Sequence, residues 1–140
     1  MVYRGPFPGP TLLYMTTPPQ IQIVDADLSI RSGLIRLLRG AGHDARGFAS
    51  VAEFLDALDP EIPGCLVLDS ETIGPTGEEL QAGLKVGGKH LPIIMVTAAD
   101  DDLTRRKARE LRAVGLYRKP VDGPALLDAV KWALEVGEMA

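Results

Sequence analysis

The chain has 140 residues, of which 46% are hydrophobic and 24% charged, and it carries a formal net charge of -4 at pH 7. This size and composition fit one compact globular domain and exclude a fibrous or largely disordered chain. The acidic balance excludes the overall basic character of proteins that bind nucleic acid directly. Its lone cysteine, Cys65, cannot build an internal disulfide framework. Since no apolar run reaches the ~18 residues of a membrane span, we expect a cytoplasmic protein.

The N-terminal segment differs in composition from the rest of the chain. Residues 1–19 contain five prolines, which block helices and lack the backbone donor that a sheet needs. We therefore predict a flexible proline-rich tail over residues 1–19 and one folded domain over residues 20–140. An extended ligand for a groove on another protein is the alternative interpretation of the tail.

From Gln20 onward, short apolar runs alternate with amphipathic segments, a pattern typical of a parallel sheet with crossover helices. Five such pairs predict the α/β class and a doubly wound sheet of five parallel strands. Three runs, around Val24, Leu68 and Val96, are apolar without alternation, as expected for strands covered on both faces. The predicted strands span residues 21–24, 44–48, 65–68, 91–96 and 115–117.

Helices are predicted between these strands from the spacing of apolar residues and from capping signals. Ser50 and Thr76 each stand three residues before a glutamate, which is the pattern of a capping box at the start of a helix. The predicted helices span residues 28–39, 50–58, 76–86, 101–112 and 122–136.

The fourth predicted helix is strongly basic and has few large apolar residues, so we expect it to pack weakly. Its basic side chains form either a solvated face or a docking surface for an acidic partner. These side chains are Arg105, Arg106, Lys107, Arg109 and Arg112.

Polar residues follow four of the predicted strands at the point where each strand ends. In an open doubly wound sheet, ligands bind where the carboxyl ends of the central strands meet. The candidate site residues are therefore Asp25 and Asp27 after the first strand, Asp69 after the third, Thr97 after the fourth and Lys119 after the fifth.

The motifs around these residues resemble those of the receiver domain of two-component response regulators. That family has an acidic pair after the first strand, an acceptor aspartate after the third, Thr or Ser followed by Ala after the fourth, and Lys-Pro after the fifth. The resemblance covers residues 20–137 and implies a flavodoxin-like (βα)5 fold. It is closest to receivers joined to a LuxR-type DNA-binding domain, which has no counterpart in these residues. The matching motifs are Val24-Asp25-Ala26-Asp27, Leu68-Asp69, Gly77, Thr97-Ala98 and Lys119-Pro120.

The resemblance implies that Asp69 accepts a phosphoryl group and that Mg²⁺ binds beside it. The implied ligands are the carboxylates of Asp25 and Asp69 and the backbone carbonyl of Glu71, which are oxygen ligands of the kind Mg²⁺ prefers. The second acid of the family's pair is Ala26 here, so we expect weak Mg²⁺ binding and less like-charge repulsion around the acceptor. Asp27 stands where the first helix needs an N-cap, and capping is favoured over rescue of the metal site.

Residues after the fourth and fifth strands have implied roles in switching. Lys119 would place its ammonium on a phosphoryl oxygen, and Thr97 would move its hydroxyl toward the newly arrived phosphoryl group. The small Ala98 would leave the acceptor accessible. The bond from Lys119 to Pro120 is implied to be cis.

The sequence leaves three functions open. The first is a non-enzymatic receiver that takes a phosphoryl group on Asp69 from a sensor histidine kinase or a phosphotransfer protein. It would switch the face of its fourth helix and fifth strand toward a downstream protein or a second copy, without binding nucleic acid or membrane. Ala26 favours the second, a degenerate receiver that binds a partner without regulated phosphorylation. The third is a haloacid-dehalogenase-like phosphatase, because Glu71 stands two residues after Asp69, although the nucleophile strand of that family comes early in the chain.

Overall fold

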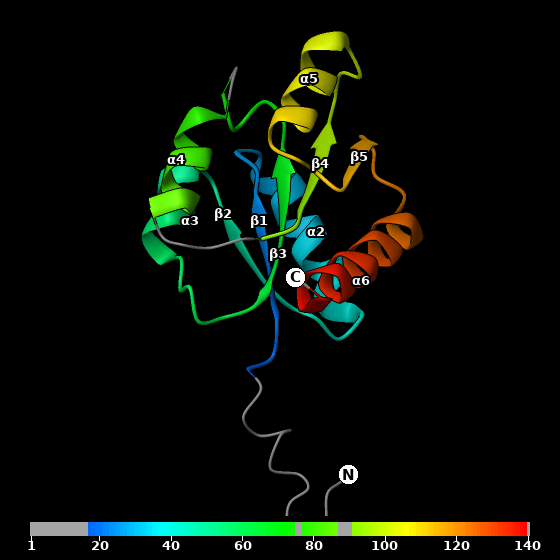
Figure 1. Ribbon diagram of the computed structural model, residues 1–140. Helices are drawn as coiled ribbons and strands as arrows, with labels where there is room; N and C mark the ends of the chain where they lie inside the picture. The colour runs from blue at the N-terminus through cyan, green and yellow to red at the C-terminus, as the bar shows by residue number, and fades with distance from the viewer. Residues whose placement is uncertain (1–16, 75–76, 87–90, 140) are drawn as a thin grey trace, which may run out of the picture.

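The strands of the computed structural model, which describes residues 17–74, 77–86 and 91–139, build one sheet (Figure 1). They are β1 (Gln20–Val24), β2 (Asp44–Phe48), β3 (Gly64–Asp69), β4 (Ile93–Thr97) and β5 (Gly115–Arg118). All pair in parallel, in the order β2-β1-β3-β4-β5. The chain therefore reverses its direction of winding between β1 and β3, and their carboxyl ends form the switch point where such sheets bind ligands. The predicted doubly wound five-stranded sheet is confirmed.

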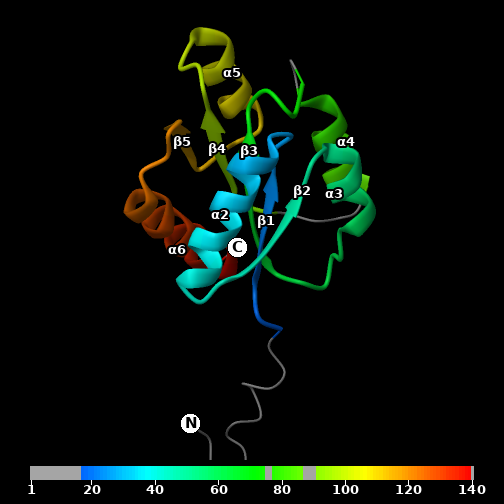
Figure 2. The same ribbon diagram turned by 180° about the vertical axis from the view of Figure 1, so that it is seen from behind.

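Helices alternate with these strands and cover both faces of the sheet. They are α2 (Leu28–Gly40), α3 (Val51–Ala57), α4 (Glu78–Val86), α5 (Asp102–Glu110) and α6 (Gly123–Met139). Figures 1 and 2 show α2 and α6 on one face and α3, α4 and α5 on the other. Each face has its own buried apolar cluster. The five helices predicted from the sequence are all present, with ends that differ by a few residues.

The central strand β3 explains why these apolar runs show no alternation of polar residues. Cys65 and Val67 point to the face covered by α2 and α6, while Leu66 and Leu68 point to the opposite face. All four are fully buried. Burial raises the pKa of the Cys65 thiol to about 12, so this cysteine is a small core residue and not a reactive thiol.

The helix starts agree with the capping signals where the structure describes them. The Asp27 carboxylate accepts a hydrogen bond from the Ile30 N–H at 3.1 Å and caps α2, as predicted. Likewise, the Ser50 hydroxyl accepts from the Glu53 N–H at 3.2 Å and caps α3. Thr76 lies outside the described residues, so the second capping box stays a prediction.

A glycine at the start of β3 fixes how closely β1 and β3 approach. A side chain at Gly64 would place its Cβ 1.8 Å from the Gln20 carbonyl oxygen. Because glycine has no Cβ, the two strands pair from their first residues onward. The register then leads Asp25 and Asp69 to emerge side by side at the carboxyl edge.

The predicted tail over residues 1–19 is only partly covered by the structure. Residues 17–19 are exposed and precede β1 without helix or strand, whereas residues 1–16 lie outside the described part, so the flexible tail stays a prediction. None of the helices in the described ranges has the length and apolar character needed to cross a lipid bilayer.

Candidate functional site

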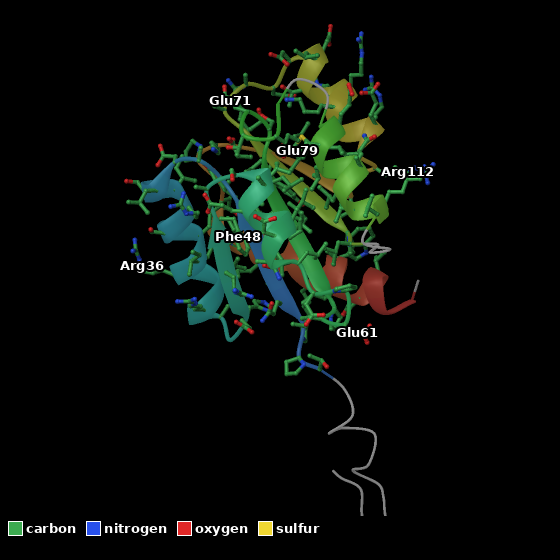
Figure 3. The ribbon with its side chains drawn as sticks, turned by 90° about the vertical axis from the view of Figure 1, so that its left-hand side faces the viewer. Arg36, Phe48, Glu61, Glu71, Glu79 and Arg112 are labelled. Carbon is green, nitrogen blue, oxygen red and sulfur yellow. The ribbon has the colours of Figure 1, made fainter. Side chains whose placement is uncertain are left out.

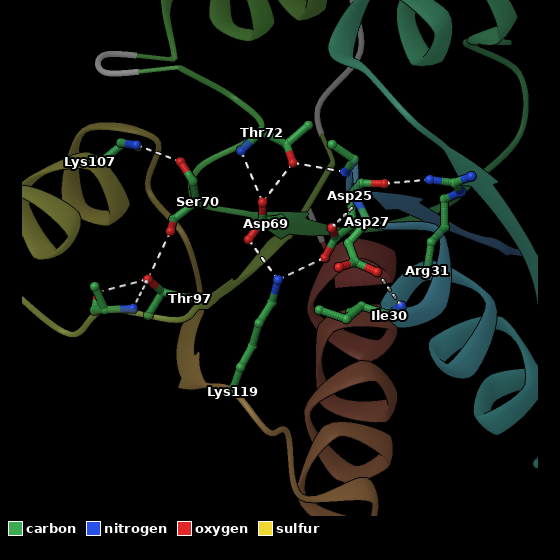
Figure 4. A network of polar contacts seen from close by, with 12 residues as sticks. Asp25, Asp27, Ile30, Arg31, Asp69, Ser70, Thr72, Thr97, Lys107 and Lys119 are labelled. Atoms are coloured by element: carbon green, nitrogen blue, oxygen red, sulfur yellow. Dashed lines mark hydrogen bonds and ion pairs between the residues drawn. The ribbon is translucent and has the colours of Figure 1, made fainter.

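Three charged side chains from three strand ends meet at the carboxyl edge of the sheet (Figure 4). Asp25 follows β1, Asp69 ends β3 and Lys119 follows β5. The Lys119 Nζ lies 2.9 Å from Asp25 Oδ2 and 2.9 Å from Asp69 Oδ1. The side chain of Lys119 is only 14% exposed, that of Asp25 2% and that of Asp69 6%. One partly buried cation therefore bridges two buried carboxylates, and the three groups leave one excess negative charge.

This arrangement sets the ionisation of the acceptor candidate. Burial alone would raise the pKa of Asp69, but hydrogen bonds from Thr72 and Lys119 and the positive charge of Lys119 hold that pKa below its ordinary value. Burial alone would lower the pKa of Lys119, yet its hydrogen bonds to Asp69 and Asp25 and their charges raise it. Both groups are consequently charged at neutral pH, and Asp69 is present in its nucleophilic, ionised form.

The loop between β3 and α4 turns back onto Asp69 through Thr72. Thr72 donates two hydrogen bonds to Asp69 Oδ2, one from its backbone N–H at 3.0 Å and one from its hydroxyl at 2.6 Å. The same hydroxyl oxygen accepts from the Ala26 N–H at 3.0 Å. A chain of hydrogen bonds thus runs from the β1–α2 loop through Thr72 to Asp69 (Figure 4).

The β1–α2 loop holds Asp25 with its own backbone. The Asp27 N–H donates to Asp25 Oδ1 at 2.9 Å, and the Arg31 guanidinium donates to the Asp25 carbonyl at 2.8 Å. The Asp27 carboxylate itself faces the N-terminus of α2, where it acts as the cap. Ala26 is exposed and offers no side-chain oxygen, so the structure brings Asp25 but not a second acid of this loop to Asp69.

On the opposite side of Asp69, a second polar network centres on Thr97. Its hydroxyl accepts from the Ser70 hydroxyl at 2.8 Å and from the Ala99 N–H at 3.0 Å, and donates to the Ala99 carbonyl at 2.7 Å. The Thr97 carbonyl also accepts from the Lys119 N–H at 2.7 Å. The Thr97 side chain is therefore hydrogen-bonded to Ser70, the residue directly after Asp69.

Helix α5 packs differently from the sequence expectation. Lys107 is only 7% exposed, and its ammonium donates to the Ser70 carbonyl. Together with Thr104, Ala108 and Leu111 it lies on the buried side of this segment. Assigning Lys107 to a solvated or docking face was wrong, because the hydrogen bond to a buried carbonyl offsets the cost of burying its charge.

The other basic residues of this segment are on the surface. Arg105 pairs with Asp100 at 3.0 Å, and both side chains are well exposed, so the pair contributes little to stability. Arg106, Arg109 and Arg112 are also exposed, and Figure 3 shows Arg112 extending away from the body of the domain. These arginines remain as the basic surface of α5 and of the turn that follows it.

The remaining predicted site residues lie around the pocket. Ala98 is exposed, and the bond from Lys119 to Pro120 is cis, as the resemblance implies. The Glu71 side chain is exposed and belongs to the segment that follows β3 (Figure 3). Its carbonyl accepts a long hydrogen bond of 3.4 Å from the Gly74 N–H.

The residues around Asp69 include oxygen ligands of the kind that Mg²⁺ prefers. Asp25 and Asp69 present carboxylate oxygens, but Lys119 already lies on one oxygen of each. Within the described ranges, no group of three or more His, Cys, Asp or Glu residues is placed to hold a metal ion. An ion bound here would keep most of its waters, as Mg²⁺ commonly does.

Comparison with known proteins identifies the family of this domain. The profile of the response regulator receiver domain matches residues 21–131. The chain belongs to this family. The receiver domain is 34% identical over 120 residues to nodulation protein W of Bradyrhizobium diazoefficiens, a match that covers 86% of this chain and 53% of that protein. It is 38% identical over 119 residues to the transcriptional regulatory protein TdiR of Thauera aromatica, covering 84% of this chain and 52% of TdiR.

Solved structures agree with this assignment. The response regulator StyR superposes with a TM-score of 0.77 and 36% identity, over 88% of this chain and 62% of StyR. A receiver protein from Burkholderia phymatum has a TM-score of 0.70 and 34% identity, over 84% of this chain and 95% of that chain. The resemblance to two-component receivers and the flavodoxin-like fold are confirmed. The chain spans about half the length of the curated relatives it matches.

Family membership sets aside the phosphatase alternative. Asp69 ends the third strand of the sheet, as a receiver acceptor does, and the Glu71 side chain that suggested a second catalytic acid is exposed. Receiver domains are signalling domains, and they typically bind Mg²⁺ in their acidic pocket.

Three residues of the site were missed by the sequence analysis, although two left a signal. Lys107 lies three residues after Thr104 and four before Leu111, with Ala108 directly after it. This is the spacing of residues that share one face of a helix. Thr72 stands three residues after Asp69, the spacing at which an aspartate side chain accepts a backbone N–H. The hydrogen bond from the Ser70 hydroxyl to Thr97 depends on a tertiary contact, so no sequence pattern indicates it.

Proposed function

We propose that this receiver domain takes a phosphoryl group onto Asp69 from a sensor histidine kinase or a phosphotransfer protein of a two-component system. The observation that supports this most is the Lys119 ammonium, 2.9 Å from a carboxylate oxygen of both Asp69 and Asp25. The buried carboxylate supplies a nucleophile, and the fixed positive charge beside it can stabilise phosphoryl oxygens.

In the proposed reaction an oxygen of Asp69 attacks the phosphorus atom of the donor and forms an acyl phosphate. The bond from phosphorus to the donor nitrogen or oxygen breaks, and the leaving group keeps the electron pair. Lys119 retains its proton and moves from the carboxylate to a phosphoryl oxygen. Mg²⁺, when bound, would offset part of the negative charge; Asp25, Asp69 and the Glu71 carbonyl are the groups that would hold it.

The proposed switch passes through the network around Thr97. For its hydroxyl to reach a phosphoryl group on Asp69, it must give up its bonds to Ser70 and Ala99. Ser70 is also the residue that Lys107 of α5 holds, so this exchange alters how α5 sits beside the pocket.

The output surface in this proposal is the face formed by α5 and β5. Receiver domains interact with histidine kinases and with downstream effectors, and the exposed Arg106, Arg109 and Arg112 suit an acidic partner. The same face suits a second copy of the domain. Direct binding of nucleic acid or membrane forms no part of the proposal, and the cytoplasm is the proposed compartment.

Phosphorylation with acetyl phosphate and saturating Mg²⁺, followed by intact-protein mass spectrometry, tests the proposal. The wild-type chain is expected to gain one phosphoryl group and Asp69→Asn none. Asp27→Asn is the matched control, because asparagine caps a helix as well as aspartate does. Among the described residues, Asp27 touches the pocket through its backbone N–H alone.

One observation favours a second candidate, a receiver that binds its partner without regulated phosphorylation. Ala26 removes an acid from the pocket, and protein donors already contact the oxygens of Asp69. Absence of labelling of the wild type by both acetyl phosphate and a phosphorylated histidine kinase would contradict the proposed phosphotransfer and leave the interaction module.

A further inference from the structure

The two oxygens of the acceptor carboxylate are occupied unequally. Among the described residues, Asp69 Oδ1 accepts one hydrogen bond, from Lys119 at 2.9 Å. Asp69 Oδ2 accepts two, from the Thr72 N–H at 3.0 Å and the Thr72 hydroxyl at 2.6 Å. A carboxylate oxygen has about two lone-pair directions, so both directions of Oδ2 are filled. A cation that approaches Oδ2 must displace one of these donors.

The hydroxyl is the donor that can leave. The Thr72 N–H is fixed by the backbone of the β3–α4 loop, whereas the hydroxyl turns away by rotation about a single side-chain bond. Thr72 is half-buried and Ala26, the other partner of this hydroxyl, is exposed, so rotation meets solvent on one side. At 2.6 Å the bond from the hydroxyl to Oδ2 is a short, charge-assisted one.

The Thr72 hydroxyl also contacts the residue that replaces the missing acid. It accepts from the N–H of Ala26, the residue that stands where the family's second acid would be, and donates to Asp69. A hydrogen-bonded link therefore connects the β1–α2 loop with Asp69.

We propose that the Thr72 hydroxyl caps Oδ2 of the acceptor carboxylate of this receiver domain and that a divalent cation must displace it to bind Asp69 through that oxygen. Thr72 is thereby a positioning residue that regulates the site. The cap lowers the cation affinity of a pocket that already lacks one acid, and it keeps Asp69 oriented in the resting state.

The test is a Mg²⁺ titration of the full, unphosphorylated chain, followed by the NMR shifts of the Ala26, Asp69 and Thr72 amides. Thr72→Val removes the hydroxyl with little change in shape, and it is expected to bind Mg²⁺ about tenfold more tightly, because a hydrogen bond to a charged group corresponds to about that factor. Thr72→Ser keeps the hydroxyl and is expected to bind as the wild type does.

A purely structural role for Thr72 predicts the opposite result. If the hydroxyl only held the loop together, Thr72→Val would bind Mg²⁺ equally or more weakly, and either outcome overturns the proposal. Thermal melting in EDTA checks that each variant is folded; should Thr72→Val fail to fold, Thr72→Ala provides the same comparison. The inference concerns the pocket of the proposed function, but its readout is cation binding, so failure of phosphorylation leaves this result unaffected.

Discussion

Asp69 lies between two flanks that hold it by different means. The cation flank, formed by Asp25, Ala26 and Thr72, relies on backbone N–H groups and one hydroxyl, and it has one acid fewer than the family pattern. The switch flank, formed by Ser70, Thr97 and Lys107, relies on buried side chains and contains an additional buried cation. The side expected to receive an ion lacks one acid of the family pattern, and the side expected to transmit the signal contains the buried ammonium of Lys107.

Because of this difference, ion binding and signal transmission depend on separate residues of one pocket. Lys119 belongs to both flanks, because its ammonium contacts Asp25 and Asp69 while its backbone N–H donates to the Thr97 carbonyl. Changes on the cation flank should therefore alter ion affinity with little effect on α5, and changes on the switch flank should do the reverse.

Removal of the shared cation should have the largest effect. Lys119→Met leaves two buried carboxylates without their partner, which should lower the free energy of unfolding by about 3 kcal/mol. Urea denaturation at pH 7 measures this difference. Lys131→Met on the exposed side of α6 is the control and should change stability by less than about 0.5 kcal/mol; equal effects of both substitutions would contradict the bridging role.

Restoring the missing acid should sharpen the cation flank next. Ala26→Asp is expected to raise the Mg²⁺ affinity by about 10- to 100-fold, since loss of one metal-site partner commonly costs that much. In EDTA the same variant should be less stable than wild type, because a third carboxylate adds like-charge repulsion. Calorimetric titration, with and without beryllofluoride, measures the affinity.

Ala26→Asn has the shape of aspartate without its charge, and it should leave the Mg²⁺ affinity close to that of the wild type. If the wild type already binds Mg²⁺ as tightly as Ala26→Asp, the weak-binding expectation is wrong.

The smallest expected effect lies on the switch flank. Lys107→Met leaves the Ser70 carbonyl without its donor and should cost about 1 kcal/mol of stability. Hydrogen exchange of the amides of α5 should become faster because the helix loses its tie to the β3–α4 loop. Arg106→Met, at the exposed neighbouring position, is the control and should change neither quantity; altered Mg²⁺ affinity in Lys107→Met would break the separation of the two flanks.

Much of the fold follows from the sequence because local patterns and tertiary structure agree. The runs that contain Val24, Leu68 and Val96 are apolar throughout since both faces of these strands are covered. Asp27 was predicted as a cap from its place before an amphipathic helix, and it is one.

The sequence predicts which residues lie at the site, but it does not predict the hydrogen bonds between them. Asp25, Asp69 and Lys119 could be placed at strand ends because the topology fixes where those ends meet. The bonds of Thr72 depend on the conformation of the β3–α4 loop, which the strand and helix patterns do not predict. The basic charge of this helix predicts a solvated face for Lys107, whereas its spacing from Leu111 indicates the buried side.

The distance along the chain between the partners of the charge bridge has a consequence for biosynthesis. Lys119 lies 94 residues after Asp25 and 50 residues after Asp69, and it is delivered by the last strand of the sheet. A nascent chain that has folded only through β4 would hold two neighbouring carboxylates without their counterion, so docking of β5 relieves an electrostatic repulsion as well as completing the sheet. Competence to accept a phosphoryl group therefore arises only with the finished domain, and a fragment that ends before β5 should be unable to acquire it.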